Sequence, residues 1–315
     1  MTVYPVIDLG LVALVLALAA STIIARDAFS AIVGYVAYGL LVAIVWIRLF
    51  APDVALTEAA IGGGVTGVML VAVGARLRKA GEKREEREPG ALLRVAAAAL
   101  SLMVAAALAA AVLLLPEPPP SLAPEATRGL ADAGLGNAVT AVLMVYRGFD
   151  TMLEKVVMTL AVVGVWSVAS DRSWGRAPAF LGMARPEAPL RFLAQTLAPI
   201  GILMGIHVFW VSADYPGGAF QGGAILAAMW MIVMMAGILR PPRIDSTRLR
   251  LALVGGPAVF LVVGLAGAGM AAGFFAFPAG YVKPVVLFIE IFMLLTIAVT
   301  LPMLVLGPPH RDAEP

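Results

Sequence analysis

The chain has 315 residues, of which 61% are hydrophobic and only 13% are charged, and its formal net charge is +2. Soluble domains are nearer half apolar and about a quarter charged, so a mean hydropathy of +0.96 predicts a polytopic membrane protein. The absence of cysteine excludes disulfide scaffolds, thiolate-bound zinc and iron–sulfur clusters in this chain.

Two further absences narrow the class of protein. The only histidines are His207 and His310, too few within the membrane to supply two axial ligands to a haem. No lysine follows the glycine spacing of a Walker A loop, so the chain is not an ATP-driven pump by itself. We expect no cofactor, no metal site, no catalytic residues and no nucleic-acid partner.

The apolar stretches predict an all-α fold with about nine transmembrane helices, because a span takes about 20 residues. They lie at 5–24, 28–50, 53–75, 92–115, 152–170, 192–210, 218–239, 251–273 and 284–306. If the N-terminus is outside, most of the 22 Lys and Arg residues fall in inner loops. The positive-inside rule therefore predicts an N-out, C-in orientation.

Two inner loops divide the chain into three modules. Residues 76–89 form a charge run of mixed sign, and residues 171–189 are rich in proline, glycine and arginine. The predicted division is a three-helix module, a charged linker, a two-helix module, a second linker, a four-helix module and a polar tail: 1–79, 80–91, 92–170, 171–190, 191–307 and 308–315.

The long outer loop has two predicted parts. Residues 116–136 are rich in proline, which favours an extended chain. In residues 137–149, the apolar side chains of Val139, Val142, Leu143 and Tyr146 follow a 3-and-4 spacing. This spacing predicts an amphipathic helix at the outer membrane interface, ahead of the fifth span.

Glu58 lies within the third apolar stretch, and Gly62, Gly63 and Gly64 follow it. A carboxyl group in hydrocarbon costs a few kcal/mol, so its default interpretation is functional. The alternative is a buried acid held neutral by an apolar site. Three glycines weaken a helix and allow a π-bulge or a close approach of another chain. We expect the third span to be irregular at this point.

Other titratable groups also fall near the predicted outer ends of spans. Glu58 and Glu290 lie about 8 and 9 Å inside, given a rise of about 1.5 Å per residue. The remaining candidates for an ion path are His207, Lys155, Glu154 and Asp150. The inner half of the spans is nearly free of charge, which predicts an outward-facing half-path that a partner must complete. The alternative for Glu154 and Lys155 is simple mutual pairing, and for His207 a structural role.

A glycine-rich motif lies at the predicted outer end of the seventh apolar stretch. Its sequence, YPGGAFQGG, requires an unusual backbone and would hold an aromatic ring and an amide in a fixed pose. The motif residues are Pro216, Gly217, Gly218, Phe220, Gln221, Gly222 and Gly223.

Three segments resemble known families of ion-transporting membrane complexes. PDVALTEAAIGGG at 52–64 is similar to the signature of MbhD and of the C-terminal part of MrpA. YRGFDTMLEKVVMTLAVVGVWSV at 146–168 resembles MbhE, and DYPGGAFQGGAILAA at 214–228 resembles MrpB, MnhB or MbhF. The first two modules also resemble the complex I subunit that carries a π-bulge in its third helix.

The resemblance implies a membrane subunit of a multisubunit Na⁺/H⁺ antiporter, in the inner membrane of a prokaryote, that is not active alone. Its implied partners are MrpA- and MrpD-like large subunits, small MrpC-, MrpE-, MrpF- and MrpG-like subunits, Na⁺, H⁺ and lipid. Glu58 matches the intramembrane glutamate of the family, whereas Lys155 stands where a small or polar residue is more usual.

Three alternatives stay open at the level of sequence. The same modules occur in the membrane arm of redox-driven pumps such as hydrogenases, where gene neighbours would include soluble redox subunits. A stand-alone permease would need polar residues across the inner half of its spans. A pure scaffold would have no ion contact, and mutation of Glu58 would reveal that case.

Overall fold

The structure is a computed structural model that describes residues 5–79, 90–178, 188–271, 273–278 and 280–309. Among these residues the regular structure is helical, and one isolated bridge joins Pro178 and Pro309. Most of the predicted linker 80–91, part of the linker 171–190 and the end of the tail 308–315, with His310, lie outside the described residues.

The first two helices form a hairpin. Helix α1 (Pro5–Ile24) packs against α2 (Ala28–Arg48), and Asp27 caps α2 by accepting a hydrogen bond from the backbone N–H of Ser30 at 2.8 Å. At the other end of the hairpin, Asp8 pairs with Arg48 at 2.8 Å. The two apolar stretches thus become helices at nearly the predicted bounds.

The third span is irregular, as the glycines predicted. It consists of α3 (Pro52–Glu58), a π-helix η1 (Ala59–Thr66) and α4 (Gly67–Lys79). The glycines of η1 also permit a close helix contact, because a Cβ atom on Gly39 of α2 would lie 3.0 Å from the backbone nitrogen of Gly63. Both expected uses of these glycines, a looser helix and close packing, are therefore present.

The loop after the fourth predicted span differs from expectation. Helix α5 (Ala91–Leu113) is followed by α6 (Ala123–Arg128) and α7 (Leu130–Ala133). The prediction of an extended chain over 116–136 is therefore wrong for its second half. Proline is tolerated in the first helical turn, and Pro124 occupies that place in α6.

The segment expected to form an amphipathic helix is helical but short and partly buried. It comprises α8 (Ala138–Ala141) and a π-helix η2 (Val142–Tyr146), and the helix breaks at Arg147 before α9 begins. Thr140, Ala141 and Met144 are buried within the chain, whereas Val139, Leu143 and Tyr146 of the predicted apolar face are exposed. The segment therefore packs on protein with the side opposite its predicted apolar face, and that face stays uncovered within the described residues.

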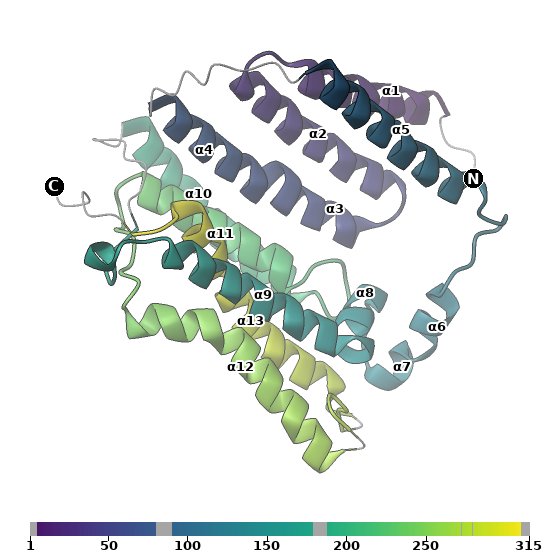
Figure 1. Cartoon of the computed structure of the whole chain (residues 1–315). Helices are drawn as coiled ribbons and strands as arrows, with labels where there is room; N and C mark the ends of the chain where they lie inside the picture. The colour runs from purple at the N-terminus through teal and green to yellow at the C-terminus, as the bar shows by residue number, and fades with distance from the viewer. Residues whose placement is uncertain (1–4, 80–89, 179–187, 272, 279, 310–315) are drawn as a thin grey trace.

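The remaining helices form the larger part of the core. They are α9 (Gly148–Ser167), the 3₁₀ turn η3 (Asp171–Ser173), α10 (Ala188–Trp210), α11 (Ala219–Met235), α12 (Thr247–Met270) and α13 (Val282–Leu306). Helix α13 lies among α9, α11 and α12, and it holds many of the fully buried side chains. Figure 1 shows α13 behind α9 and between α11 and α12.

The predicted first and last modules lie side by side. Segments α3 and η1 pack against α11, and α4 packs against α13. Figure 1 shows α3 and α4 running along the group that contains α10 and α11. Residues far apart in the sequence therefore meet at this boundary, where the glycine-rich motif forms the turn before α11 and the first residues of that helix.

Seven of the described helical segments are long and apolar enough to cross a membrane. The two other predicted spans are helices as well: α11 is apolar but has 17 residues, and α9 has 20 residues with Asp150, Glu154 and Lys155 in its first half. The chain is a polytopic all-α membrane protein. The total of nine spans and the N-out orientation stay predictions.

Candidate functional site

A cavity of about 170 Å³ lies where the predicted modules meet. Residues of α3, η1, α8, η2, α9, α11 and α13 line it, together with the glycine-rich turn before α11. Its polar side chains include Thr57, Thr151, Glu154, Lys155, Gln221 and Glu290. A water molecule takes about 30 Å³ of liquid volume, so the cavity can hold a few waters or a partly hydrated cation.

Glu290 is the buried carboxylate of this cavity. It lies on α13 with 4% of its surface exposed, between the core residues Ile289 and Met293. Ser212 donates a hydrogen bond to Glu290 Oε2 at 2.7 Å, and the backbone of Ala219 also hydrogen-bonds to the carboxyl group. Because Ala219 is the first residue of α11, the positive end of that helix faces the carboxylate.

Lys155 brings a buried amine to the same cavity. Lys155 has 2% of its surface exposed. Its Nζ atom lies 2.9 Å from Glu154 Oε1 and 5.0 Å from the centre of the Phe220 ring. The Glu154 side chain is 54% exposed, so the ion pair joins a dry cation to a partly hydrated carboxylate. A cation removed from water needs such a partner and benefits from an aromatic face.

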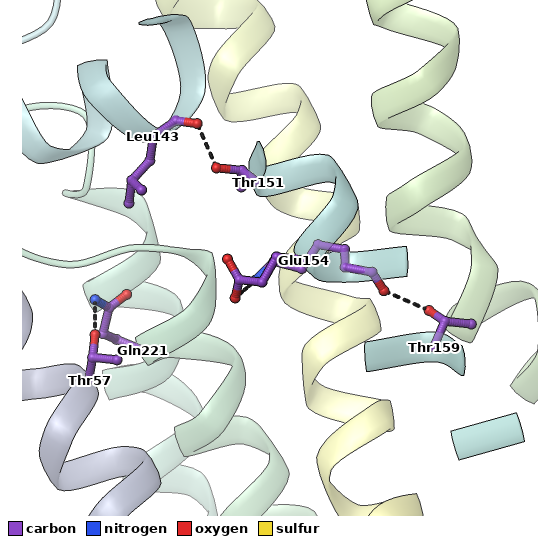
Figure 2. Close-up of polar contacts among 7 residues, drawn as sticks. Thr57, Leu143, Thr151, Glu154, Thr159 and Gln221 are labelled. Carbon is purple, nitrogen blue, oxygen red and sulfur yellow. Dashed lines mark hydrogen bonds and ion pairs between the residues drawn. The ribbon is translucent and has the colours of Figure 1, made fainter. Parts of the chain in front are cut away.

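The glycine-rich motif supplies one rim of the cavity. Gln221 donates a hydrogen bond from Nε2 to Thr57 Oγ1 at 3.0 Å, and Figure 2 shows this pair across the cavity from Glu154. Thr151 donates to the carbonyl oxygen of Leu143 at 2.7 Å and so joins α9 to η2. The motif holds Phe220 over Lys155 and Gln221 on the third span.

The other sequence-based candidates lie apart from this cavity. Glu58 is half-buried at the end of α3, and a Cβ atom on Gly62 would overlap its Oε1 atom, so its side chain folds onto η1. Its neighbours Thr57 and Ile61 line the cavity instead. His207 is exposed on α10, and Asp150 is exposed and bound to Arg147 at 2.6 Å. The structure therefore groups Glu290, Lys155 and Glu154, and separates them from Glu58, His207 and Asp150.

Three polar residues of this region were not recognised from sequence. Asp53 is buried and contacts the glycine-rich turn, Asn137 is buried beside it, and Ser212 is fully buried against Glu290. Asp53 stands inside the 52–64 motif, so its position could have been a signal, but it resembled the polar end of a span. Asn137 has the local pattern of a helix N-cap, which explains its bond to Val139 but not its contact with Asp53, and Ser212 has no local pattern that marks it.

The chemistry of the site suits the transfer of protons or small cations. Two carboxyl groups and one amine share a partly open cavity whose other walls are largely apolar, and hydroxyl and amide groups complete the lining. Carboxylate, hydroxyl and water oxygens are the groups that hard cations prefer. A buried carboxyl group and a buried amine can also change protonation state as the charge nearby changes.

Comparisons with known proteins confirm the resemblance to MbhD and to MnhB. Residues 13–79 match the family model MbhD, which describes the D subunit of MBH. Residues 189–307 match MnhB, a domain related to the MnhB subunit of the Na⁺/H⁺ antiporter. The chain is a fused MbhD and MnhB-type membrane subunit. The two matched domains together cover more than half of it, and the MbhE-like assignment of 92–170 stays a prediction.

Solved structures share the fold of the MbhD–MnhB fusion. A chain of the Mrp complex from Dietzia sp. DQ12-45-1b superposes with a TM-score of 0.76 and 23% identity, over 97% of the fusion and 35% of that chain. A chain of the membrane-bound sulfane sulfur reductase, an archaeal respiratory membrane complex, superposes with a TM-score of 0.55 and 22% identity. That match covers 68% of the fusion and 97% of the other chain.

One curated relative also matches in sequence. An uncharacterised protein of Methanocaldococcus jannaschii, MJ1307, is 27% identical over 146 residues, which is 42% of the fusion and 56% of the relative. The fusion thus spans just over half of this relative and about a third of the matching chain of the Mrp complex. The Mrp superposition includes the middle segment between the MbhD and MnhB-related domains, since it extends over nearly the whole fusion.

Proposed function

We propose that the fusion is a membrane subunit of a multisubunit cation/proton antiporter, with Na⁺ as the cation, in the plasma membrane of a prokaryote. Its partners are the other membrane subunits of an Mrp-type complex, both large and small. The two matched domains and the fold shared with the Mrp complex support this proposal. Exchange requires the assembled complex, because one chain supplies only part of the path.

The observation that carries the proposal is the shared cavity between the two matched domains. Thr57 of the MbhD domain, Gln221 and Glu290 of the MnhB-related domain, and Lys155 of the middle segment line it together. Titratable groups in an apolar membrane segment are costly and mark ion or proton paths. Glu290, Lys155 and Glu154 therefore form the ion-path group of this chain.

Glu58 is a second ion-binding or proton-binding group in the proposed path. Its carboxyl group lies at the start of η1, one residue after Thr57 of the cavity wall. π-helices often mark functional sites within helices. Glu58 lies at the start of η1, so a change in the backbone of η1 moves its carboxyl group relative to the cavity. A cation or proton then passes between Glu58 and the group around Glu290.

A redox-driven pump is the second candidate function. The fold similarity to a chain of an archaeal respiratory membrane complex favours it, since that chain is matched over nearly its full length. In this case the same cavity serves ion movement, and electron transfer in other subunits supplies the energy. The subunits bound to the fusion separate the two candidates.

The test is purification of the tagged fusion in mild detergent, followed by identification of the chains that co-purify. The isolated complex and the isolated fusion are then reconstituted in vesicles, and sodium-dependent pH change is followed. We expect exchange only with the complex. Robust exchange by the fusion alone would overturn the subunit proposal, and co-purification of soluble redox subunits would favour the second candidate.

A further inference from the structure

Asp53 is the centre of a cluster of hydrogen bonds that joins three parts of the chain. Its Oδ1 atom accepts from the backbone N–H of Gly217 at 2.9 Å and from Asn137 Nδ2 at 3.4 Å. Its backbone carbonyl accepts from Gln221 Nε2 at 3.4 Å. Asp53 is 7% exposed, so these contacts replace water that a carboxylate would otherwise keep.

The backbone conformation at Gly217 explains why the turn before α11 needs contacts from outside to hold it in place. Its φ angle is +151°, in a region that L side chains rarely adopt, and a Cβ atom there would overlap the carbonyl oxygen of Val208. Glycine permits the turn but carries no side chain to hold it in place. The Asp53 carboxylate supplies that hold from another domain, 164 residues away in the sequence.

Asn137 and Thr140 extend this cluster of hydrogen bonds toward Glu290. Its Nδ2 atom also donates to the carbonyl oxygen of Tyr215 at 3.0 Å, and Thr140 donates to the carbonyl oxygen of Ser212 at 2.7 Å. Ser212 in turn donates to Glu290. The segment from Ser212 to Gln221, which includes the start of α11, is therefore held at both ends, by Asp53 and Asn137 on one side and by Thr140 on the other.

We propose that Asp53 is a positioning residue that fastens the glycine-rich turn over the cavity between the MbhD and MnhB-related domains. The fastened turn forms one wall of the cavity and holds Gln221 on Thr57 and Phe220 over Lys155. The position of this wall is independent of which ion the complex moves, and only its effect on exchange rests on the proposed function.

The test measures how fast a buried thiol in the cavity reacts with a water-soluble thiol reagent in the purified full chain. Met293 lines the cavity and is buried, and the chain has no cysteine to remove, so Met293→Cys is the reporter. Val162→Cys is a second reporter, because Val162 is fully buried in a separate core cluster. Because both positions are buried, we expect both reporters to react slowly when Asp53 is intact.

Asp53→Ala removes the acceptor of two buried donors, so the turn loosens. We expect the reaction of the Met293→Cys thiol to accelerate by about tenfold or more, the factor for 1.4 kcal/mol, while the Val162→Cys thiol stays slow. Asp53→Asn keeps an oxygen at Oδ1 and stays close to the unmodified rate. Asp27→Ala is the matched control, because Asp27 is a carboxylate of the same domain that accepts a backbone N–H at the opposite end of α2 from Asp53.

Two results overturn the proposal: an unchanged rate at Met293→Cys in Asp53→Ala, or equal acceleration of both reporters, which indicates general loosening.

If Asp53→Ala does not give a monodisperse protein, Asp53→Glu and Asp53→Asn are compared instead. The longer side chain displaces the acceptor by one methylene, so only Asp53→Glu accelerates the reaction. Equal rates in these two variants overturn the proposal. A failure of ion exchange in the complex leaves this measurement unaffected.

Discussion

Ser212, in the turn after α10, donates a hydrogen bond to the carboxyl group of Glu290 on α13 at 2.7 Å. Both residues are buried, so neither can exchange this contact for one with water. The pair connects the end of one helix of the MnhB-related domain to the middle of its most buried helix, next to the cavity.

Removal of the hydroxyl group in Ser212→Ala leaves the buried carboxyl group without this donor. We expect the free energy of unfolding in detergent to fall by about 1–3 kcal/mol. The matched control is Ser167→Ala, because the Ser167 hydroxyl bonds only to a carbonyl in its own helix at an exposed position. An equal effect of the two substitutions would show that the Ser212 contact contributes nothing specific.

Replacement of Lys155 by methionine keeps an apolar side chain of similar length but removes the buried charge. Since Glu154 is half-exposed, the unpaired carboxylate stays hydrated and the complex still assembles. We expect sodium-dependent proton exchange in vesicles to fall by about tenfold or more, which corresponds to about 1.4 kcal/mol. Lys283→Met is the control, because Lys283 pairs with Asp214 on the surface. Exchange at the rate of the unmodified complex would remove Lys155 from the path.

Glu58→Gln preserves size and hydrogen bonding while abolishing titration. We expect the complex to assemble normally and to lose most of its ion exchange, because a carboxyl group in a membrane segment is retained for charge rather than for packing. Exchange is measured across a range of pH, and Glu125→Gln on the exposed helix α6 is the control. Exchange at the control rate at every pH would make Glu58 structural.

The contact between Gly39 and η1 predicts a large effect of one methyl group. A Cβ atom in Gly39→Ala would lie 3.0 Å from Gly63 N and 3.1 Å from Gly62 C, and backbone atoms cannot yield as a flexible side chain can. We expect thermal unfolding in detergent to reveal a loss of about 1–3 kcal/mol. Gly164→Ala meets no atom within 4 Å and should stabilise by up to about 1 kcal/mol. A neutral Gly39→Ala would argue against tight packing here.

The orientation can be tested at two exposed positions on either side of α9. Asp132 precedes this helix and Arg172 follows it, and both are exposed. If α9 crosses the membrane and the N-terminus is outside, Asp132→Cys reacts with an impermeant thiol reagent added to intact cells. Arg172→Cys reacts only after the membrane is opened. The opposite pattern would reverse the predicted topology, and equal labelling from outside would mean that α9 does not span.

Much of the fold follows from local patterns in the sequence. Runs of apolar residues predict the long helices, since a backbone in lipid must satisfy its own hydrogen bonds. The glycines after Glu58 predict the irregular third span, and η1 confirms it. The 52–64 and 214–228 motifs also identify the two domains that the family models match. Each of these features depends on residues that are neighbours in the chain.

The arrangement of the cavity depends on tertiary structure. Glu58 stands out in the sequence because its own segment is apolar, yet Lys155 and Glu290 share the cavity while Glu58 turns toward Gly62. Asp53 and Gly217 meet across 164 residues, and Ser212 and Glu290 across 78. No local periodicity encodes such pairs, because they depend on how the MbhD and MnhB-related domains pack. The sequence by itself determines the helices and the cost of burying each charge, and the packing of helices decides which buried groups meet.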